Sequence, residues 1–161
     1  SYYTGGMNFI DMMQLTSKSI IDNGNRVEYT RSKTKGLFNL KLTPPAKAII
    51  NRYKLNASIT GFVFPILNSN HKTPIQIANR RHKTITQLNK NLKEIGRLCN
   101  IDFDLTSYVA RHSFATHLKQ KNIATDIISE ALGHQNIKVT QTYLKRFGNE
   151  VTDNALETLI H

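Results

Sequence analysis

Three short extended stretches, separated by two tight turns, lie between residues 19 and 42. The stretches cover residues 19–21, 26–32 and 37–42, and Asn, Asp, Gly and Lys fill the turns. Strands joined by such short connections pair antiparallel with their neighbours. Because the other periodic segments are helical, this pattern predicts a mainly α fold with a small three-stranded antiparallel β-sheet.

Helical patterns occupy most of the remaining chain. Apolar residues at helical spacing predict helices over residues 7–15, 44–53, 78–99, 106–119, 125–133, 139–147 and 151–160. Thr43, followed by two prolines, favours a helix start, and Thr106 or Ser107 and then Thr125 are expected to cap later helices. Residues 58–72 are rich in turn formers, so we expect a loop there with a short extended piece.

The length of 161 residues suits one domain with one buried core, so we treat residues 1–161 as a single domain. The chain begins at Ser1 with no initiator Met, basic segment or long apolar run. This favours a piece of a larger protein and argues against a signal peptide or a membrane span. The single cysteine, Cys99, has no partner for an internal disulfide and no metal-ligand pattern around it, so we expect a reducing, intracellular setting.

Positive charge is concentrated in one part of the chain. Residues 29–93 contain 13 Lys or Arg and no Asp or Glu, whereas the rest of the chain contains 9 basic and 11 acidic residues. Like charges gathered on one surface repel each other unless an anion lies against them. A basic surface of this kind is typical of nucleic-acid binding, and a merely solvated basic surface is the alternative.

The segment between residues 108 and 143 supplies the groups that are needed to cut a DNA phosphodiester without a metal. The reaction requires a hydroxyl nucleophile, cations that hold the phosphate oxygens in the transition state, and an acid for the departing 5′ hydroxyl. Tyr, Arg, His and Lys suit these tasks. Three motifs contain such residues: Arg-His-x-Phe-Ala-Thr at 111–116, Leu-Gly-His at 132–134 and Thr-x-x-Tyr at 140–143.

Three linked motifs are far more specific than one, and with them the chain resembles the tyrosine recombinase or phage integrase family, which includes integrases of mobile genetic elements. The resemblance implies that family's catalytic-domain fold and site-specific DNA recombination, with integration or excision through a 3′-phosphotyrosyl intermediate and with no cofactor or metal. It implies that Tyr143 is the nucleophile, that Arg111 grips the scissile phosphate through two parallel hydrogen bonds, and that His134 is a second phosphate donor.

The plainer alternatives for these residues are structural. Tyr143 lies beside apolar residues and could belong to the core, and His134 could be a surface histidine at a helix end. Lys33 lies at the tip of the second hairpin, where the family carries a mobile lysine that protonates the leaving 5′ hydroxyl. A hairpin-tip lysine that serves only solubility is the alternative there.

Two positions depart from the family pattern. The family's first catalytic arginine follows a Gly-Leu or Gly-Met pair, but here Asn8 follows Gly-Met. The His of the H-x-x-R motif is Tyr108, which can donate a hydrogen bond but cannot act as an imidazole base. Side chains two apart on a strand share a face, so Arg31 is expected to point the same way as Lys33 and is a candidate to replace the missing arginine.

The resemblance also implies double-stranded DNA as the partner. The expected contacts with the DNA backbone are Lys35, Arg80, Arg81 and Lys83. The family clamps DNA with a second, N-terminal core-binding domain, which we expect to be absent from this chain. We expect a homo-tetramer on DNA for the full-length protein, a monomer for the isolated domain, and a setting on the nucleoid in the bacterial cytoplasm. Docking of residues 151–160 on a neighbouring protomer or on their own core stays open.

Three other functions compete with this interpretation. Since Asn8 and Tyr108 are altered, the first is a catalytically impaired DNA-binding module, which forms no covalent adduct with DNA. The second is topoisomerase-like relaxation by the same chemistry, but the intact Leu-Gly-His close before Tyr143 favours a recombinase. An RNA-binding domain is least favoured, because the sequence shows no sheet studded with aromatic residues.

Overall fold

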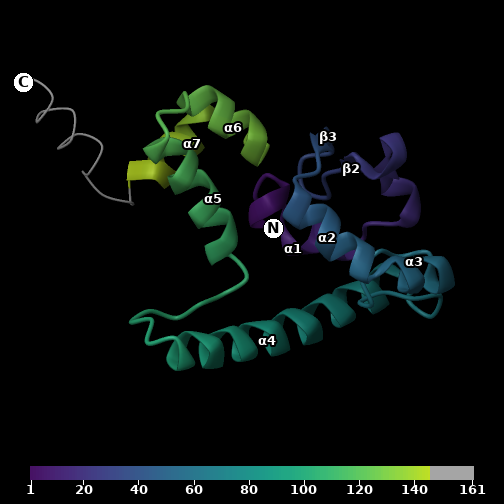
Figure 1. Cartoon of the computed structure of the whole chain (residues 1–161). Coiled ribbons are helices and arrows are strands. Elements are labelled where there is room, and N and C mark those ends of the chain that lie inside the picture. Colours follow the sequence, from purple (N-terminus) through teal and green to yellow (C-terminus); the bar gives the residue numbers. More distant parts are fainter. Residues whose placement is uncertain (146–161) are drawn as a thin grey trace, which may run out of the picture.

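The computed structural model describes residues 1–145, with the backbone alone at residues 143 and 145 (Figure 1). The helices are α1 (Phe9–Met13), α2 (Pro44–Arg52), α3 (Lys54–Thr60), α4 (Pro74–Leu98), α5 (Val109–Gln120), α6 (Thr125–Leu132) and α7 (Ile137–Lys145). The strands are β1 (Ile20–Ile21), β2 (Arg26–Thr30) and β3 (Leu37–Lys41), and 3-10 turns lie at Tyr2–Thr4, Ser17–Ser19 and Asp22–Gly24. The mainly α fold with one small sheet is confirmed.

The three strands form one antiparallel sheet in the order β1-β2-β3. Tyr29 of β2 pairs with Phe38 of β3, and their rings stack with centroids 5.3 Å apart, a cross-strand contact that stabilises a sheet. Helices α1 and α2 share the first core with the sheet; its buried residues are Met7, Leu15, Val27, Leu42, Ala46 and Val63. This core holds the β2–β3 hairpin, whose loop contains Arg31 and Lys33.

A second core lies where α5, α6 and α7 meet (Figure 1). Ala115 of α5 packs with Ile128 and Leu132 of α6, and none of the three is more than 1% exposed. Helix α6 ends at Gly133, which has the left-handed conformation with φ 64°, as its glycine predicts. The C-terminal end of α6 is therefore fixed on the second core.

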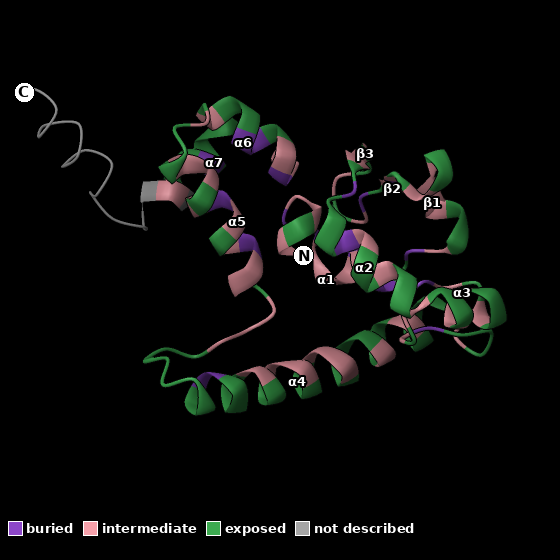
Figure 2. Cartoon of the chain, in the orientation of Figure 1, coloured by how far each residue is buried: buried purple, intermediate pink, exposed green. Residues whose placement is uncertain are grey.

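Helix α4 runs along one side of the molecule, and only Gly96 of its residues is buried (Figure 2). It begins with a capping box: the Thr73 hydroxyl accepts from the backbone N–H of Gln76, and the Gln76 side chain accepts from the N–H of Thr73. Pro74 occupies the first turn, where its missing N–H has no consequence. Between residues 1 and 145, no helix is both long enough and apolar enough to cross a membrane.

Several predicted helix boundaries are wrong. Helix α3 was not predicted at all: it ends at Thr60, inside the segment predicted as a loop, and Asn56 supports it by donating to the carbonyl of Phe62 at 2.9 Å. Helix α4 starts at Pro74 rather than at residue 78, because the capping box lies upstream of the apolar pattern. These starts depend on side-chain contacts that periodicity does not detect.

Two predicted caps are also wrong. Tyr108, not Thr106 or Ser107, is the N-cap residue of α5, and Ala124, not Thr125, is that of α6; neither makes a side-chain cap. The backbone N–H of Ser107 instead donates to the side chain of Asn89 in α4 at 2.8 Å. Helix α7 begins at residue 137 rather than 139. The predicted helix over residues 151–160 lies outside the described residues.

Candidate active site

Two buried arginines meet at the C-terminal end of α6. Arg111 of α5 is 4% exposed, and Arg31, in the loop after β2, is 6% exposed. Both donate hydrogen bonds to the carbonyl oxygen of Leu132. The last carbonyls of a helix have no partner within the helix and carry partial negative charge, so cations are stable there. The end of α6 thus brings two guanidinium groups to one point.

Arg111 is held by backbone groups from distant parts of the chain. Its Nη1 donates to the carbonyl of Gly6 at 2.7 Å, and its Nη2 donates to that of Leu132 at 2.5 Å. Nη2 also lies 3.3 Å from Nε2 of His134. Arginine can only donate, so Nε2 is the acceptor in this contact. The fold therefore brings the arginine of the first motif next to the histidine of the second.

His134 lies just beyond α6 and is partly buried. Its Nδ1 is 2.7 Å from the hydroxyl Oγ1 of Thr140 in α7, a side chain that is 0% exposed. Burial, and then the positive charges of Arg111, Arg31 and Lys33, lower the pKa of His134 to about 4. His134 is consequently neutral at physiological pH, and it lies in a positive potential.

The route by which Arg31 reaches the site differs from the prediction. Strand β2 ends at Thr30, so Arg31 does not lie on a strand. Its side chain is buried, whereas that of Lys33 is exposed. The prediction that Arg31 and Lys33 share a strand face is therefore wrong, because the chain leaves the strand geometry before either residue.

Arg31 turns inward to the end of α6. Its Nη1 donates to the carbonyls of Leu132 and Gly133, and its Nε lies 4.0 Å from a carboxylate oxygen of Asp11. The other Asp11 oxygen accepts from the backbone N–H of Ser32 at 2.8 Å. Asp11 in α1 thereby positions both the hairpin loop and the guanidinium that the loop carries.

The approach of Arg31 requires a glycine at position 133. A Cβ there would overlap with Nη1 of Arg31 and with Cζ of Phe38. Gly133 also has a positive φ, which residues with a side chain rarely adopt. The glycine of the Leu-Gly-His motif thus ends α6 and leaves room for the guanidinium.

Lys33 and Lys35 are exposed in the turn between β2 and β3. The N–H of Lys35 donates to the carbonyl of Arg31, and the N–H of Arg31 donates to that of Gly36, each at 2.9 Å. Lys35 adopts a left-handed conformation with φ 58°. Lys33 is near enough for its charge to lower the pKa of His134, so its ammonium contributes to the electrostatics of the site.

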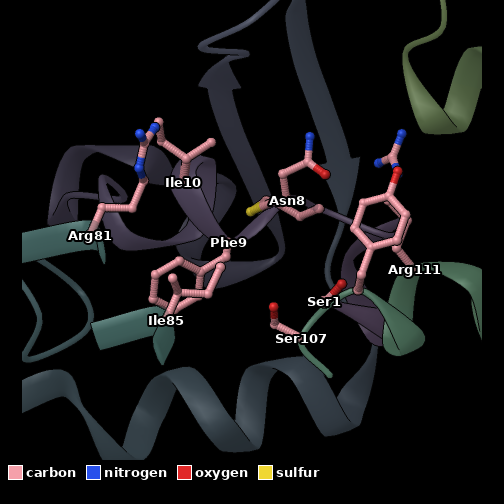
Figure 3. Close-up of a pocket in the computed structure, with 10 residues that line it drawn as sticks. Ser1, Asn8, Phe9, Ile10, Arg81, Ile85, Ser107 and Arg111 are labelled. Atoms are coloured by element: carbon pink, nitrogen blue, oxygen red, sulfur yellow. The ribbon is translucent and has the colours of Figure 1, made fainter. Parts of the chain in front are cut away.

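The two altered family positions line one cleft together with Arg111. This cleft has a volume of about 280 Å³, and it is also lined by Arg81 of α4. Figure 3 shows Asn8 between Arg81 and Arg111, with the polar ends of the three side chains directed to the same side. Tyr108 is 50% exposed, and its ring packs edge-on to that of His112 with centroids 4.6 Å apart. Asn8 and Tyr108 therefore border the approach to Arg111.

The remaining predicted DNA contacts lie on α4. Arg81 and Lys83 are exposed. Arg80 is partly buried, and its Nε donates to the carbonyl of Ile66 at 2.8 Å. Part of the Arg80 side chain thus supports the loop that precedes α4.

Tyr143 belongs to α7, three residues after Thr140, and its side chain lies outside the described part of the structure. Helix α7 contacts α5 and α6, and Thr140 binds His134. The backbone that carries Tyr143 is therefore anchored beside the histidine.

Sequence reasoning missed three partners at this site: the Thr140 hydroxyl, the Gly6 carbonyl and the Asp11 carboxylate. Thr140 was visible as the first residue of the Thr-x-x-Tyr motif. The other two depend on contacts between distant segments, for which the sequence carries no local signal. Across the described residues 1–145, no group of three or more His, Cys, Asp or Glu side chains is placed to hold a metal ion.

The profile of the Phage integrase family matches residues 2–150. Tyrosine recombinase XerD of Halalkalibacterium halodurans is 44% identical over 54 residues, which are 34% of this chain and 18% of XerD. A tyrosine recombinase of Thermosipho africanus is 33% identical over 87 residues, 51% of this chain and 31% of that protein. XerA of Pyrococcus furiosus is 39% identical over 74 residues, 43% of this chain and 25% of XerA. The matched stretches span less than a third of each relative.

Solved structures share the fold at low sequence identity. The crystal structure of a XerA recombinase has a TM-score of 0.69 and 15% identity, and the match covers 99% of this chain and 55% of that one. The Tn1549 transposon integrase, solved with transposon right end DNA, has a TM-score of 0.68 and 15% identity over 99% of this chain and 56% of its own. From the family profile that matches residues 2–150, and from a fold that joins the motifs at one point, it follows that this chain belongs to the phage integrase family.

Proposed function

We propose that this chain is the catalytic part of a site-specific tyrosine recombinase that cuts and rejoins double-stranded DNA. The phenol of Tyr143 gives its proton to water as its oxygen attacks the scissile phosphorus, the bond to the 5′ oxygen breaks, and Lys33 gives a proton to that oxygen, which leaves as the 5′ hydroxyl. In the reverse step a 5′ hydroxyl from the partner strand gives its proton to the Lys33 amine and attacks the 3′-phosphotyrosine, and the released phenolate of Tyr143 regains a proton from water. The covalent intermediate conserves the energy of the phosphodiester, so rejoining needs no other energy source.

The observation that carries the proposal is the contact between Arg111 and His134 at the end of α6, 3.3 Å apart. A guanidinium and an imidazole can donate to the non-bridging oxygens of one phosphate, and donors fixed in advance stabilise the charge that these oxygens gain in the transition state. Burial, and then the positive charges of Arg111, Arg31 and Lys33, lower the pKa of His134, so cationic groups surround this point. An anion such as phosphate relieves this repulsion.

Two further residues complete the proposed site. Tyr108 borders the cleft at the family's histidine position, and its phenol is a hydrogen-bond donor to the phosphate. Arg31 takes the role of the family arginine that Asn8 replaces, and its bond to the Leu132 carbonyl beside Arg111 supports this assignment.

DNA is the proposed partner, and the exposed cations Lys35, Arg81 and Lys83 are its proposed backbone contacts, with the outer nitrogens of Arg80 beside them. The Tn1549 integrase was solved with transposon end DNA and a XerH recombinase with its difH substrate, which supports a DNA ligand for this fold. We further propose that residues 1–161 form one catalytic domain, and that the full-length protein assembles as a tetramer on DNA.

Trapping the covalent intermediate tests the function. The full-length protein is incubated with a nicked attachment-site duplex, from which the cleaved end diffuses away, and the protein–DNA adduct is separated under denaturing conditions. We expect an adduct with the natural chain and none with Tyr143→Phe, whereas the affinity of the two for intact DNA is similar. An adduct that persists in Tyr143→Phe contradicts the role of Tyr143.

A catalytically impaired DNA-binding module is the second candidate, and Asn8 and Tyr108 favour it. It predicts salt-dependent DNA binding with no adduct on any nicked site. The same trapping experiment therefore separates the two functions.

A further inference from the structure

Thr140 has no part in the chemistry proposed above, yet it is a completely buried polar side chain. It lies in α7 with 0% of its surface exposed, and its Oγ1 is 2.7 Å from Nδ1 of His134. Buried hydroxyl groups are nearly always hydrogen-bonded. Here the partner is a ring nitrogen of a residue proposed to bind the scissile phosphate.

The contact on the opposite side of the ring fixes the direction of this hydrogen bond. Nη2 of Arg111 can only donate, so Nε2 of His134 accepts from it at 3.3 Å. A neutral imidazole with an acceptor at Nε2 carries its proton on Nδ1. Nδ1–H therefore donates to Oγ1 of Thr140, and the donors run from Arg111 through His134 to Thr140.

Binding a phosphate oxygen demands the opposite role from Nε2, which must then donate. The proton can move from Nδ1 to Nε2, after which Nδ1 needs a donor, or a second proton can arrive, after which Nδ1–H still needs an acceptor. A hydroxyl serves both states, because it has one proton to give and two lone pairs. A carbonyl, a carboxylate or a methyl group serves at most one of them.

We propose that Thr140 is a positioning residue, whose hydroxyl holds the His134 ring in place while Nε2 changes from accepting from Arg111 to donating to the scissile phosphate. The phosphate step rests on the proposed function, whereas the hydrogen bond in the DNA-free protein does not. Among the described residues, the charged groups that lower the pKa of His134, after burial, are Arg111 from α5 and Arg31 and Lys33 from the hairpin loop. All three oppose protonation of the ring until an anion arrives.

Two variants separate the hydroxyl of Thr140 from its bulk. Thr140→Val keeps the shape and loses the hydroxyl, and Thr140→Ser keeps the hydroxyl. In the full-length protein we expect Thr140→Val to slow adduct formation on a nicked duplex roughly 10- to 100-fold, since Nδ1 of His134 loses the hydroxyl that holds the ring in place. Thr140→Ser should recover most of this rate, and the affinity for DNA should change less than about threefold in both, because the phosphate contacts remain.

Nitrogen-15 NMR of the histidine ring tests the contact without DNA. We expect the natural protein to hold His134 with its proton on Nδ1 near neutral pH. Thr140→Val should keep this tautomer, because Nε2 still accepts from Arg111, but should shift the Nδ1 resonance, because the Nδ1–H loses its acceptor. A proton on Nε2 in the natural protein, or a Thr140→Val variant that forms adduct at the natural rate, overturns the proposal. If neither the natural protein nor a variant forms an adduct, the proposed function fails, and the NMR result still decides whether the Thr140 hydroxyl accepts from Nδ1–H of His134.

A double-mutant cycle covers the case in which Thr140→Val is less stable. If the hydroxyl acts through the imidazole, Thr140→Val should slow adduct formation no further once His134→Ala has been introduced. If Thr140→Val slows adduct formation by the same factor in the His134→Ala protein as in the natural protein, the effect comes from folding and the proposal is overturned.

Discussion

Arg31 and Arg111 donate hydrogen bonds to the same carbonyl oxygen, that of Leu132. One arginine comes from the hairpin on the first core and the other from α5 on the second, so the end of α6 joins the two cores. Guanidinium groups that converge on one oxygen repel each other, and the Asp11 carboxylate, 4.0 Å from Arg31, offsets part of that repulsion. An incoming phosphate would offset more, which is why this point suits an anion.

Gly133→Ala should destabilise the domain more than glycine loss at another helix end. The new Cβ would overlap with Nη1 of Arg31 in a residue with positive φ, and we expect a loss of roughly 2–4 kcal/mol in the free energy of unfolding by urea. Gly61 is the matched control, because it also ends a helix, with φ 79°, and its added Cβ would meet nothing within 4 Å. Gly61→Ala should lose only about 1 kcal/mol. Equal losses of unfolding free energy for Gly133→Ala and Gly61→Ala would show that the position of the Arg31 guanidinium does not depend on Gly133.

His134 should make the domain less stable in acid. Burial, and then Arg111, Arg31 and Lys33, lower its folded pKa to about 4, whereas an unfolded histidine titrates near about 6.5. The unfolded chain therefore binds more protons between these values, so the stabilisation is complete above about pH 6.5 and is lost as the pH falls toward about 4. Between about pH 7 and about pH 5, the free energy of unfolding in urea should fall more for the natural protein than for His134→Asn. An identical fall in the free energy of unfolding for the two proteins would contradict the lowered pKa of His134.

The sequence predicts the sheet, every described helix except α3, and the approach of Arg111 to His134, because each depends on a local pattern or on a motif with fixed spacing. It does not predict that Arg31 leaves the strand and turns inward. That conformation depends on Asp11 and on the carbonyls at the end of α6, which are distant in the chain. Helix starts were missed for a related reason: side-chain caps and packing set them, not apolar periodicity.

Arg81 should contribute one phosphate contact to DNA binding. It is exposed and lines the cleft that contains Arg111. Arg81→Ala should weaken binding and reduce the slope of log affinity against log salt concentration by about 0.9, the value for one neutralised phosphate. Arg97 lies on the same helix but pairs with Glu94 at 2.7 Å, so Arg97→Ala should leave the slope unchanged. Equal slopes for the two variants, measured by fluorescence anisotropy across a salt series, would exclude this contact.

Arg31→Ala should slow cleavage far more than it weakens DNA binding, if Arg31 replaces the family's first arginine. We expect a loss of roughly 100-fold or more in the rate of adduct formation, because a guanidinium that meets the transition state is removed, with a change of less than about tenfold in affinity. Arg31→Lys should not restore the rate, since an ammonium cannot reproduce the planar donor geometry.

Asn8→Arg in the Arg31→Ala background supplies the decisive comparison. Asn8 lines the cleft beside Arg111, so an arginine there should recover part of the lost rate. If Arg31→Ala loses affinity and rate in equal measure and Asn8→Arg recovers neither, Arg31 serves only to join the hairpin to α6.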